Sequence, residues 1–187
     1  MKKLIAFLLA GMLILALAAC GGEKPAPTGT TPTQAPTQGG SDPAGVITEL
    51  YFQPKGVKLE IGAPPAPALA ALKEALGEPI SELECPSCAL QAMDIDYTYD
   101  GFKLTVTYPE QGDDYITTIK LSSDKYTIPG GITVGSAPED VFAAYGTDYR
   151  ENNSHYYYTQ GLSVLHISIV DGKVAQIAYE NADFIDM

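Results

Sequence analysis

An internal repeat is the feature that most limits what this chain can fold into. A Tyr-x-x-Pro-x-Gly pattern occurs twice, at Tyr51, Pro54 and Gly56 and again at Tyr126, Pro129 and Gly131. Each copy is followed by the same series: a short β-branched segment ending in Gly, an alanine-rich helix ending in Gly, and three strands. A unit that recurs in this way must bury its apolar face against its own elements or against its twin. We therefore expect two similar folded units in tandem.

Both predicted helices have defined ends. In the first copy, apolar residues at helical spacing predict a helix over residues 68–76 that stops at Gly77. In the second copy, Ser136 and Glu139 have the spacing of a capping box. The second helix is therefore expected to begin at this box and to end at Gly146.

Alternating apolar residues predict the strands that complete each copy. A lead strand precedes each helix, and a hairpin and a last strand follow it. The lead strands are expected at residues 57–61 and 132–134, and the last strands at 116–121 and 174–179. Hairpin turns are predicted at Asp100-Gly101 in the first copy, and at Gln160-Gly161 and Asp171-Gly172 in the second.

The predicted fold class is α+β, with two tandem repeats that each pack a helix on a three- to four-stranded antiparallel meander. The first repeat covers residues 46–122 and the second covers residues 123–187. From the helix-ending Gly to the turn Gly there are 24 residues in the first copy and 15 in the second. The nine extra residues predict an insertion at Ser81–Leu90, the segment that contains Cys85 and Cys88.

The N-terminus has the pattern of an export signal. Two lysines and an apolar run that ends at Ala19 predict a signal peptide over residues 1–19, too short for a permanent membrane span. The segment Leu17–Cys20 resembles a bacterial lipobox. This resemblance implies that Cys20 becomes the mature N-terminus and carries a diacylglycerol lipid, so that two acyl chains anchor the protein to the cell membrane. The alternative is an ordinary signal peptide followed by a chance cysteine.

Residues 20–45 are expected to form a disordered tether behind the anchor. They are rich in Pro, Thr, Gln and Gly and contain almost no apolar residues, so they cannot bury enough surface to offset the entropy of ordering. A flexible coil of this length spans roughly 25–30 Å. The folded part would then stand off the membrane, on the extracytoplasmic face, at the cell surface or in the periplasm.

The charge of the chain excludes one class of partner. The formal net charge is −12 at pH 7. An acidic protein repels the phosphate backbone of nucleic acids, so we expect no nucleic-acid binding.

The repeated motifs resemble a known superfamily. The Ile/Val-Gly start of each copy, the helix that ends in Gly (Gly77-Glu78-Pro79 in the first copy) and the meander are similar to one superfamily of small domains. It includes the β-lactamase-inhibitor-protein-like domains and the small lipoprotein of the outer-membrane β-barrel assembly machinery. The resemblance covers most of residues 51–179. It implies a secreted or lipid-anchored protein that binds other proteins, in the inhibitor through a concave, aromatic-bearing sheet. It carries over no catalytic residue.

Cys85 and Cys88 are the first candidates for chemistry. Outside the cytoplasm, two thiols this close most simply form a disulfide that closes a local loop. The alternative is thiol–disulfide redox catalysis, which needs an activated thiolate, usually at a helix N-terminus. Glu82 and Glu84 oppose thiolate formation, and no strand of a thioredoxin-like unit precedes the pair. Zinc would need two ligands beyond the two sulfurs.

The chain's only two histidines are the second candidates. With Gln160-Gly161 as a two-residue turn, His155 lies directly opposite His166 on the neighbouring strand. Such a pair could bind a transition metal weakly or repel itself at mildly acid pH. The alternatives are a register slip caused by a bulge, or two half-buried polar residues. No carboxylate is obviously placed as a third ligand, so we assign no metal and no other cofactor.

An aromatic face on the second meander is the third candidate. The same register places Tyr156 opposite Leu165, with Tyr158 and Ile167 on the same face. The equivalent face of the first copy is polar and is expected to face solvent, with Asp96, Thr98, Lys103, Thr105 and Thr107. The apolar face either packs against the first unit or forms a recognition patch. As a candidate binding face, it is expected to expose Tyr156 and Tyr158.

Together these features predict a non-enzymatic, membrane-anchored lipoprotein that binds a protein or another envelope component. The alternative function is an envelope thiol–disulfide redox protein that uses Cys85 and Cys88. The sequence contains no Ser-His-Asp order, phosphate-binding loop or zinc-binding helix motif that would indicate another enzyme.

Overall fold

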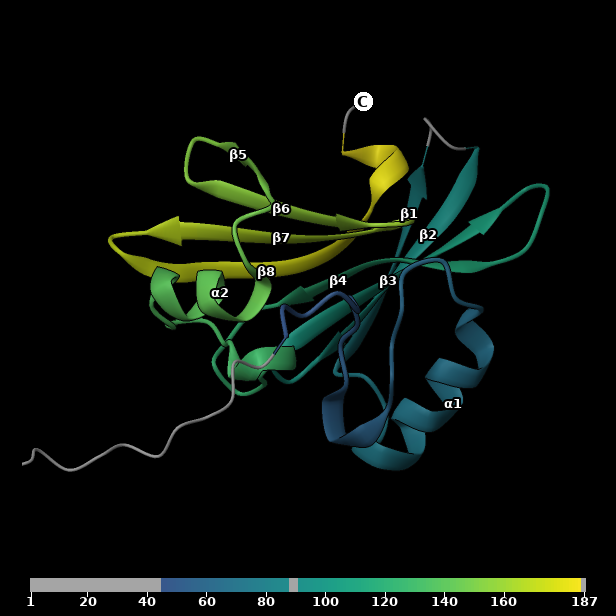
Figure 1. Cartoon of the computed structure of the whole chain (residues 1–187). Helices are drawn as coiled ribbons and strands as arrows, with labels where there is room; N and C mark the ends of the chain where they lie inside the picture. The colour runs from purple at the N-terminus through teal and green to yellow at the C-terminus, as the bar shows by residue number, and fades with distance from the viewer. Residues whose placement is uncertain (1–44, 88–90, 186–187) are drawn as a thin grey trace, which may run out of the picture. The chain divides into compact units, whose positions relative to one another are not determined.

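One antiparallel sheet dominates the fold in a computed structural model that describes residues 45–87 and 91–185 (Figure 1). The predicted signal peptide, Cys20, almost all of the predicted tether and Cys88 lie outside the described residues. The lipid anchor and the disulfide therefore stay predictions.

The sheet contains eight strands in the order β1-β2-β3-β4-β8-β7-β6-β5. Their bounds are β1 (Ser81–Ser87), β2 (Ala92–Tyr99), β3 (Phe102–Pro109), β4 (Tyr115–Leu121), β5 (Arg150–Asn152), β6 (His155–Gln160), β7 (Ser163–Val170) and β8 (Lys173–Asn181). The two halves of the chain meet where β4 pairs with β8, with Leu121 opposite Ile177. Neighbouring strands are antiparallel throughout.

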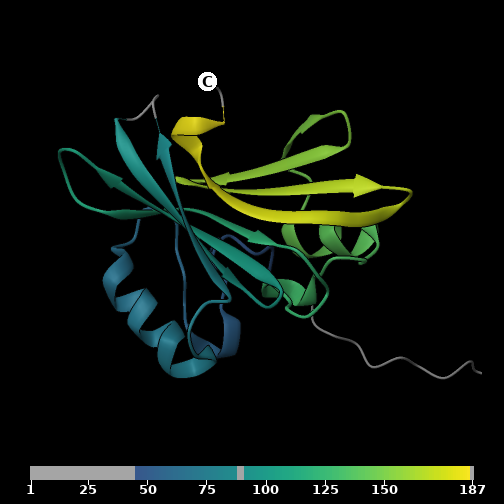
Figure 2. The same ribbon diagram turned by 180° about the vertical axis from the view of Figure 1, so that it is seen from behind.

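In the described part of the chain, two α-helices and three short 3₁₀ turns accompany the sheet. They are α1 (Pro65–Leu76), α2 (Pro138–Tyr145), η1 (Pro54–Gly56), η2 (Pro129–Gly131) and η3 (Ala182–Phe184). Both α-helices lie on one side of the sheet, and η3 lies on the other (Figures 1 and 2). Among the described residues, no helix is long and apolar enough to cross a membrane.

The prediction of two separate α+β units, each a helix on its own meander, is wrong. The fold is predominantly β, because the strands of both halves form one sheet and the helices are short. Pairing of β4 with β8 satisfies backbone groups that two separate meanders would leave as open edges. A single hydrophobic core also runs through both halves, from Phe52 and Leu72 to Leu165 and Tyr179.

Several turn and helix boundaries agree with the sequence prediction. The helices end at Gly77 and Gly146, as expected. The hairpin turns at Asp100-Gly101 and Asp171-Gly172 are confirmed by pairing of the residues that flank them. The predicted last strands correspond to β4 and β8.

Other local predictions are wrong. Ala137 takes the N-cap position of α2, and Ser136 Oγ instead accepts a hydrogen bond of 3.0 Å from the backbone N–H of Thr133. The capping box therefore does not form. The lead strands are reduced to isolated bridges, such as the one that joins Phe52 to Leu59, because the chain turns away after each.

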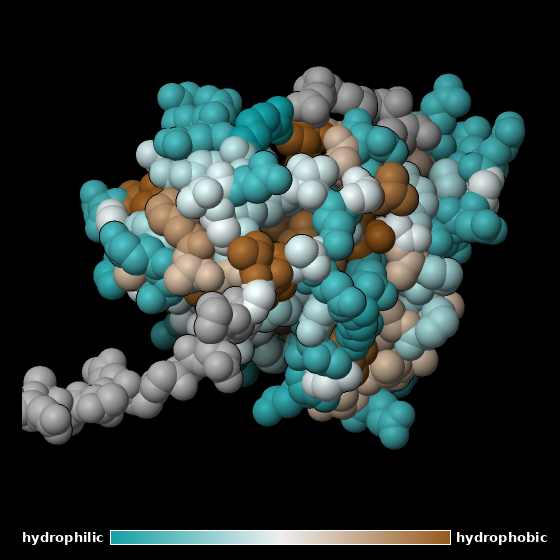
Figure 3. Space-filling view, viewed as in Figure 1, coloured by the Kyte–Doolittle hydropathy of each residue, from teal (hydrophilic) through white to brown (hydrophobic). Residues whose placement is uncertain are grey.

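The predicted insertion in the first copy is the edge strand β1. It extends over seven residues and pairs with β2 along its whole length. The other edge strand, β5, has three residues. Hydrophobic residues on the side seen in Figure 3 lie in small separate groups among hydrophilic ones.

Candidate functional site

The side of the sheet away from α1 and α2 carries a continuous set of polar strand residues, and we call it the open face. Successive strand residues point to opposite sides of a sheet. Because Leu104, Ile119 and Ile177 are buried in the core, their neighbours along each strand belong to the open face. Its polar residues, from β2 across the sheet to β5, include Asp94, Asp96, Lys103, Thr105, Thr107, Lys120, Glu180, Lys173, His166, His155, Tyr157 and Arg150.

The open face differs in charge from the rest of the protein. Its strands carry four of the chain's 11 basic residues and three of its 23 acidic residues: Lys103, Lys120, Lys173 and Arg150 against Asp94, Asp96 and Glu180. The other 7 basic and 20 acidic residues give the rest of the sequence a net charge of −13. The strands of the open face therefore carry less net negative charge than the rest of the sequence.

Hydrogen bonds hold the aspartates of the first half in place. Asp96 accepts bonds of 2.6 Å from Lys103 Nζ and from Thr105 Oγ1. Asp94 Oδ1 accepts a bond of 2.6 Å from Thr107 Oγ1. Thr107 was expected to face solvent, but it is fully buried. The carboxylates are thus oriented by their cross-strand neighbours.

The two histidines meet on the second half of the open face. His155 Nδ1 in β6 lies 2.7 Å from His166 Nε2 in β7, a hydrogen-bond distance. The other ring nitrogen of His166, Nδ1, lies 3.3 Å from Glu180 Oε2 in β8. We call His155, His166 and Glu180 the histidine cluster.

The contact between the histidines was expected, but the register behind it was wrong. Gln160 pairs with Ser163, so the turn consists of Gly161 and Leu162 instead of Gln160 and Gly161. Gly as the first residue of a two-residue turn is typical of type II′. The strands are consequently shifted by two residues, and His166 lies opposite Tyr157. A two-residue shift keeps every side chain on its face, so the histidines still touch diagonally.

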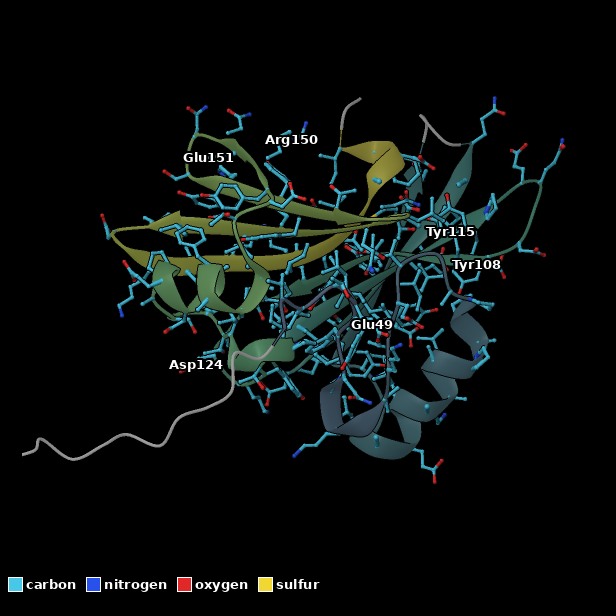
Figure 4. All side chains as sticks on the ribbon, in the orientation of Figure 1. Glu49, Tyr108, Tyr115, Asp124, Arg150 and Glu151 are labelled. Carbon is cyan, nitrogen blue, oxygen red and sulfur yellow. The ribbon has the colours of Figure 1, made fainter. Side chains whose placement is uncertain are left out.

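Aromatic and cationic groups cover the histidine cluster. The ring of Tyr157 stacks on that of His166, with centroids 4.6 Å apart and planes inclined by 19°. The guanidinium of Arg150 lies over the Tyr157 ring, 4.8 Å from its centroid. Arg150 comes from the edge strand β5, as does its neighbour Glu151 (Figure 4). This stack restricts the His166 ring to one orientation.

A hollow of about 330 Å³ opens next to the cluster. It is lined by Thr118, Tyr157, His166, Glu180, Asn181, Phe184 and Ile185. Phe184 belongs to η3, so the C-terminal turn forms one wall, and the strands form the floor. The hollow combines one carboxylate, one imidazole and two aromatic rings within reach of solvent.

The predicted exposure of the tyrosine face is wrong for Tyr158, which packs against Tyr145 of α2. Tyr158 is 5% exposed, and Leu165 and Ile167 are completely buried. Tyr156 is half-buried and packs edge-on against Phe142 of α2. Tyr158, Leu165 and Ile167 instead belong to the single core that both halves share, which agrees with the structural alternative for this face.

Burial also changes the chemistry of Tyr158. Removal from water raises the pKa of its hydroxyl to about 12, and the nearby Tyr149 and Tyr156 add to the effect. The neutral hydroxyl donates a hydrogen bond of 3.2 Å to the carbonyl oxygen of Gly146. Tyr158 thus fixes the end of α2 to the sheet.

Cys85 lies within β1, opposite Asp94. Activated thiolates usually lie at helix N-termini or beside cationic groups. The position of Cys85 in a strand, opposite a carboxylate, gives the redox alternative no support.

Sequence reasoning missed Glu180, Tyr157 and Arg150. The acidic side chain of Glu180, directly after the apolar Ile177, Ala178 and Tyr179, was a visible signal. Its link to His166 depends on the pairing of β7 with β8, whereas the contacts of Tyr157 depend on the true β6–β7 register.

The part of the chain that the structure describes contains no group of three or more His, Cys, Asp or Glu side chains arranged to hold a metal ion. A bound ion would need water or a partner to complete its ligands. No protein-family model, no curated protein and no solved structure matches this chain.

Proposed function

We propose that this protein is a lipid-anchored, non-enzymatic binding module on the extracytoplasmic side of the cell membrane, and that the open face binds a partner protein. The lipobox-like Leu17–Cys20 supports the anchor. The resemblance to lipid-anchored and secreted binding domains supports the role.

The observation that carries the proposal is the contrast between the two sides of the sheet. The helix side is filled by the core, whereas the open face offers a hollow, aromatic rings and a local excess of basic groups. Aromatic and Arg side chains beside a pocket are typical of the residues that dominate protein interfaces. Tyr157 and Arg150 have this position.

Charge reversal on each side tests where the partner binds. Lys120→Glu places a negative charge on the exposed middle of the open face, and Lys73→Glu does so on the exposed surface of α1 as a matched control. We expect a partner cross-linked to the full chain in envelope preparations to be lost at least about tenfold with Lys120→Glu, and kept with Lys73→Glu. Equal recovery with both variants would place the interface elsewhere.

Detergent phase partitioning tests the anchor. The chain with Cys20 should enter the detergent phase, and its mass should include the acyl groups. Cys20→Ser should abolish both properties. An unmodified Cys20 in the mature protein would contradict the anchor without affecting the open-face prediction.

A further inference from the structure

The edge strand β1 has one side along which no described strand pairs with it. β2 is the only described strand that pairs with β1. β1 extends over seven residues, whereas β5 at the other edge of the sheet has three. A sheet edge of this length is a template for one more strand, and a segment that extends a sheet in this way binds mainly through its backbone.

Pro86 identifies the residues of β1 whose backbone groups point outward. Along an antiparallel strand, successive residues direct their N–H and C=O groups alternately toward the paired strand and away from it. Proline has no N–H, so in an edge strand it takes a position whose N–H would point away from the sheet. Glu84 and Glu82 lie two and four residues before Pro86, so their N–H and C=O groups also point away from β2. These two residues supply the outward donors of β1.

The side chains of this edge are exposed and uncompensated. Ile80, directly before β1, is 71% exposed and Leu83 is 59% exposed, and these are the two most exposed large apolar side chains in the described part of the chain. Glu82 and Glu84 are exposed as well. No basic residue that the structure describes forms an ion pair with either glutamate. The edge therefore combines apolar surface with two free negative charges.

The register of β1 determines which segment would fit this edge. Glu82 lies opposite Tyr97 on the helix side of the sheet, and Leu83 lies opposite Asp96 on the open face. In an added antiparallel strand, the residue opposite Leu83 would be flanked by the two residues opposite Glu82 and Glu84. Basic side chains at the two flanking positions would compensate the glutamates, and an apolar side chain between them would cover Leu83. The edge thus fits a basic–apolar–basic segment.

We propose that β1 binds an extended segment of a partner protein in which a Lys or Arg stands on each side of an apolar residue, and that this segment joins the sheet antiparallel to β1. The outward backbone groups of β1 supply the hydrogen bonds, and Glu82 and Glu84 select a basic segment over an acidic one. This edge is a second interface beside the open face and does not depend on the partner proposed there.

Titration of the full chain with a synthetic peptide, followed by the NMR signals of the backbone amides, tests the edge. The probe is a peptide of about seven residues that alternates valine and lysine and has blocked ends. We expect it to shift the amide signals of Glu82 and Glu84 and to slow their hydrogen exchange. A matched peptide with glutamate in place of lysine should bind at least about tenfold more weakly. The proposal is overturned if the lysine peptide leaves these amides unchanged at about 10 mM.

Charge reversal tests the selection by the glutamates. Glu84→Lys should weaken binding of the lysine peptide about tenfold and strengthen binding of the glutamate peptide by a similar factor. Asp124→Lys makes the same change of charge at an exposed position in the loop after β4, and it should change either affinity less than about twofold. Equal effects of the two variants would show that only the net charge of the chain attracts the peptide.

Glu84→Pro tests the backbone pairing. It removes one outward N–H at a type of position where edge strands tolerate proline, whereas Glu84→Gln removes the charge and keeps the N–H. We expect the lysine peptide to lose binding with Glu84→Pro and to bind only about threefold more weakly with Glu84→Gln. Slow exchange of the Cys85 amide, which is directed at β2, checks that β1 stays in the sheet. Equal affinities of the two variants would overturn strand addition, and if Glu84→Pro releases β1, the charge-reversal result decides.

Discussion

Individual tyrosines determine how this protein responds to alkaline pH. Burial raises the pKa of Tyr158 to about 12 and that of Tyr179 well above its usual value. In the unfolded chain both lose their protons near pH 10, so the folded state binds more protons above that pH. The stabilisation is therefore complete below pH 10 and is lost as the pH rises through about 12. We expect the free energy of unfolding, measured with urea, to fall over this range, and to fall less steeply in Tyr158→Phe.

The same variant has a second expected effect at neutral pH. Without the hydroxyl, the carbonyl of Gly146 loses its bond from Tyr158, so the protein should be about 0.5–1.5 kcal/mol less stable. Identical alkaline slopes for the variant and the parent would show that Tyr158 ionises equally well in both states.

Among the residues of the candidate site, the sequence could predict only those whose neighbours come from one hairpin. The contact of His155 with His166 survived a wrong turn because a shift of two residues preserves the face of a strand. Glu180 could not be placed beside His166 because a bulge at Ser168 and Ile169 shifts the register of the β7–β8 hairpin by one residue, which changes the face on which Glu180 lies. A bulge of this kind leaves no trace in local periodicity.

At the scale of elements, both helices end in the same unusual backbone conformation. Gly77 has φ 86° and ψ −165°, and Gly146 has φ 79° and ψ −164°. Essentially only glycine adopts this region, and the backbone strain of any other residue there destabilises the folded state by about 1–3 kcal/mol. We expect Gly77→Ala to destabilise the protein by about this amount in thermal or urea unfolding, with Gly45→Ala within about 0.5 kcal/mol as a control.

Gly146→Ala should lower the free energy of unfolding more than Gly77→Ala does. A Cβ at Gly146 would lie 3.2 Å from Val46 Cγ1, whereas a Cβ at Gly77 would meet no atom within 4 Å. Equal losses of stability in the two variants would contradict this ranking.

These helix ends were predictable because their cause is local. The failed capping box at Ser136 was not, because its hydroxyl had a competing backbone donor in Thr133.

At the scale of the whole molecule, the joint between β4 and β8 makes the two halves one cooperative structure. Ile177 of β8 is fully buried opposite Leu121 of β4, in a core that both halves fill. Ile177→Ala should therefore lower the free energy of unfolding by about 2–5 kcal/mol. Hydrogen exchange should show β2 and β3 of the other half opening in the same transition, whereas the exposed Ala175→Ser should change little. Two separate transitions would contradict this.

The joint also explains why the fold class was predicted wrongly. Local patterns identified most of the strands and helices, but whether two meanders stay apart or merge depends on which edges pair. The spacing of Val57 and Ile61 suggested a strand. In the structure both residues pack on the core in the segment that leads to α1, where only an isolated bridge forms.

Because the halves join through their last strands, the seven-residue strand β1 is left with one row of backbone groups unpaired by any described strand. Glu82 and Glu84 of this strand are exposed. If β1 of a second copy paired antiparallel with this edge, its Glu82 and Glu84 would lie next to the same residues of the first copy. Like charges on adjoining strands repel, and charged edge strands resist aggregation for this reason. The acidic edge therefore opposes pairing with the same edge of a second copy, while it still attracts a foreign strand that carries lysine or arginine.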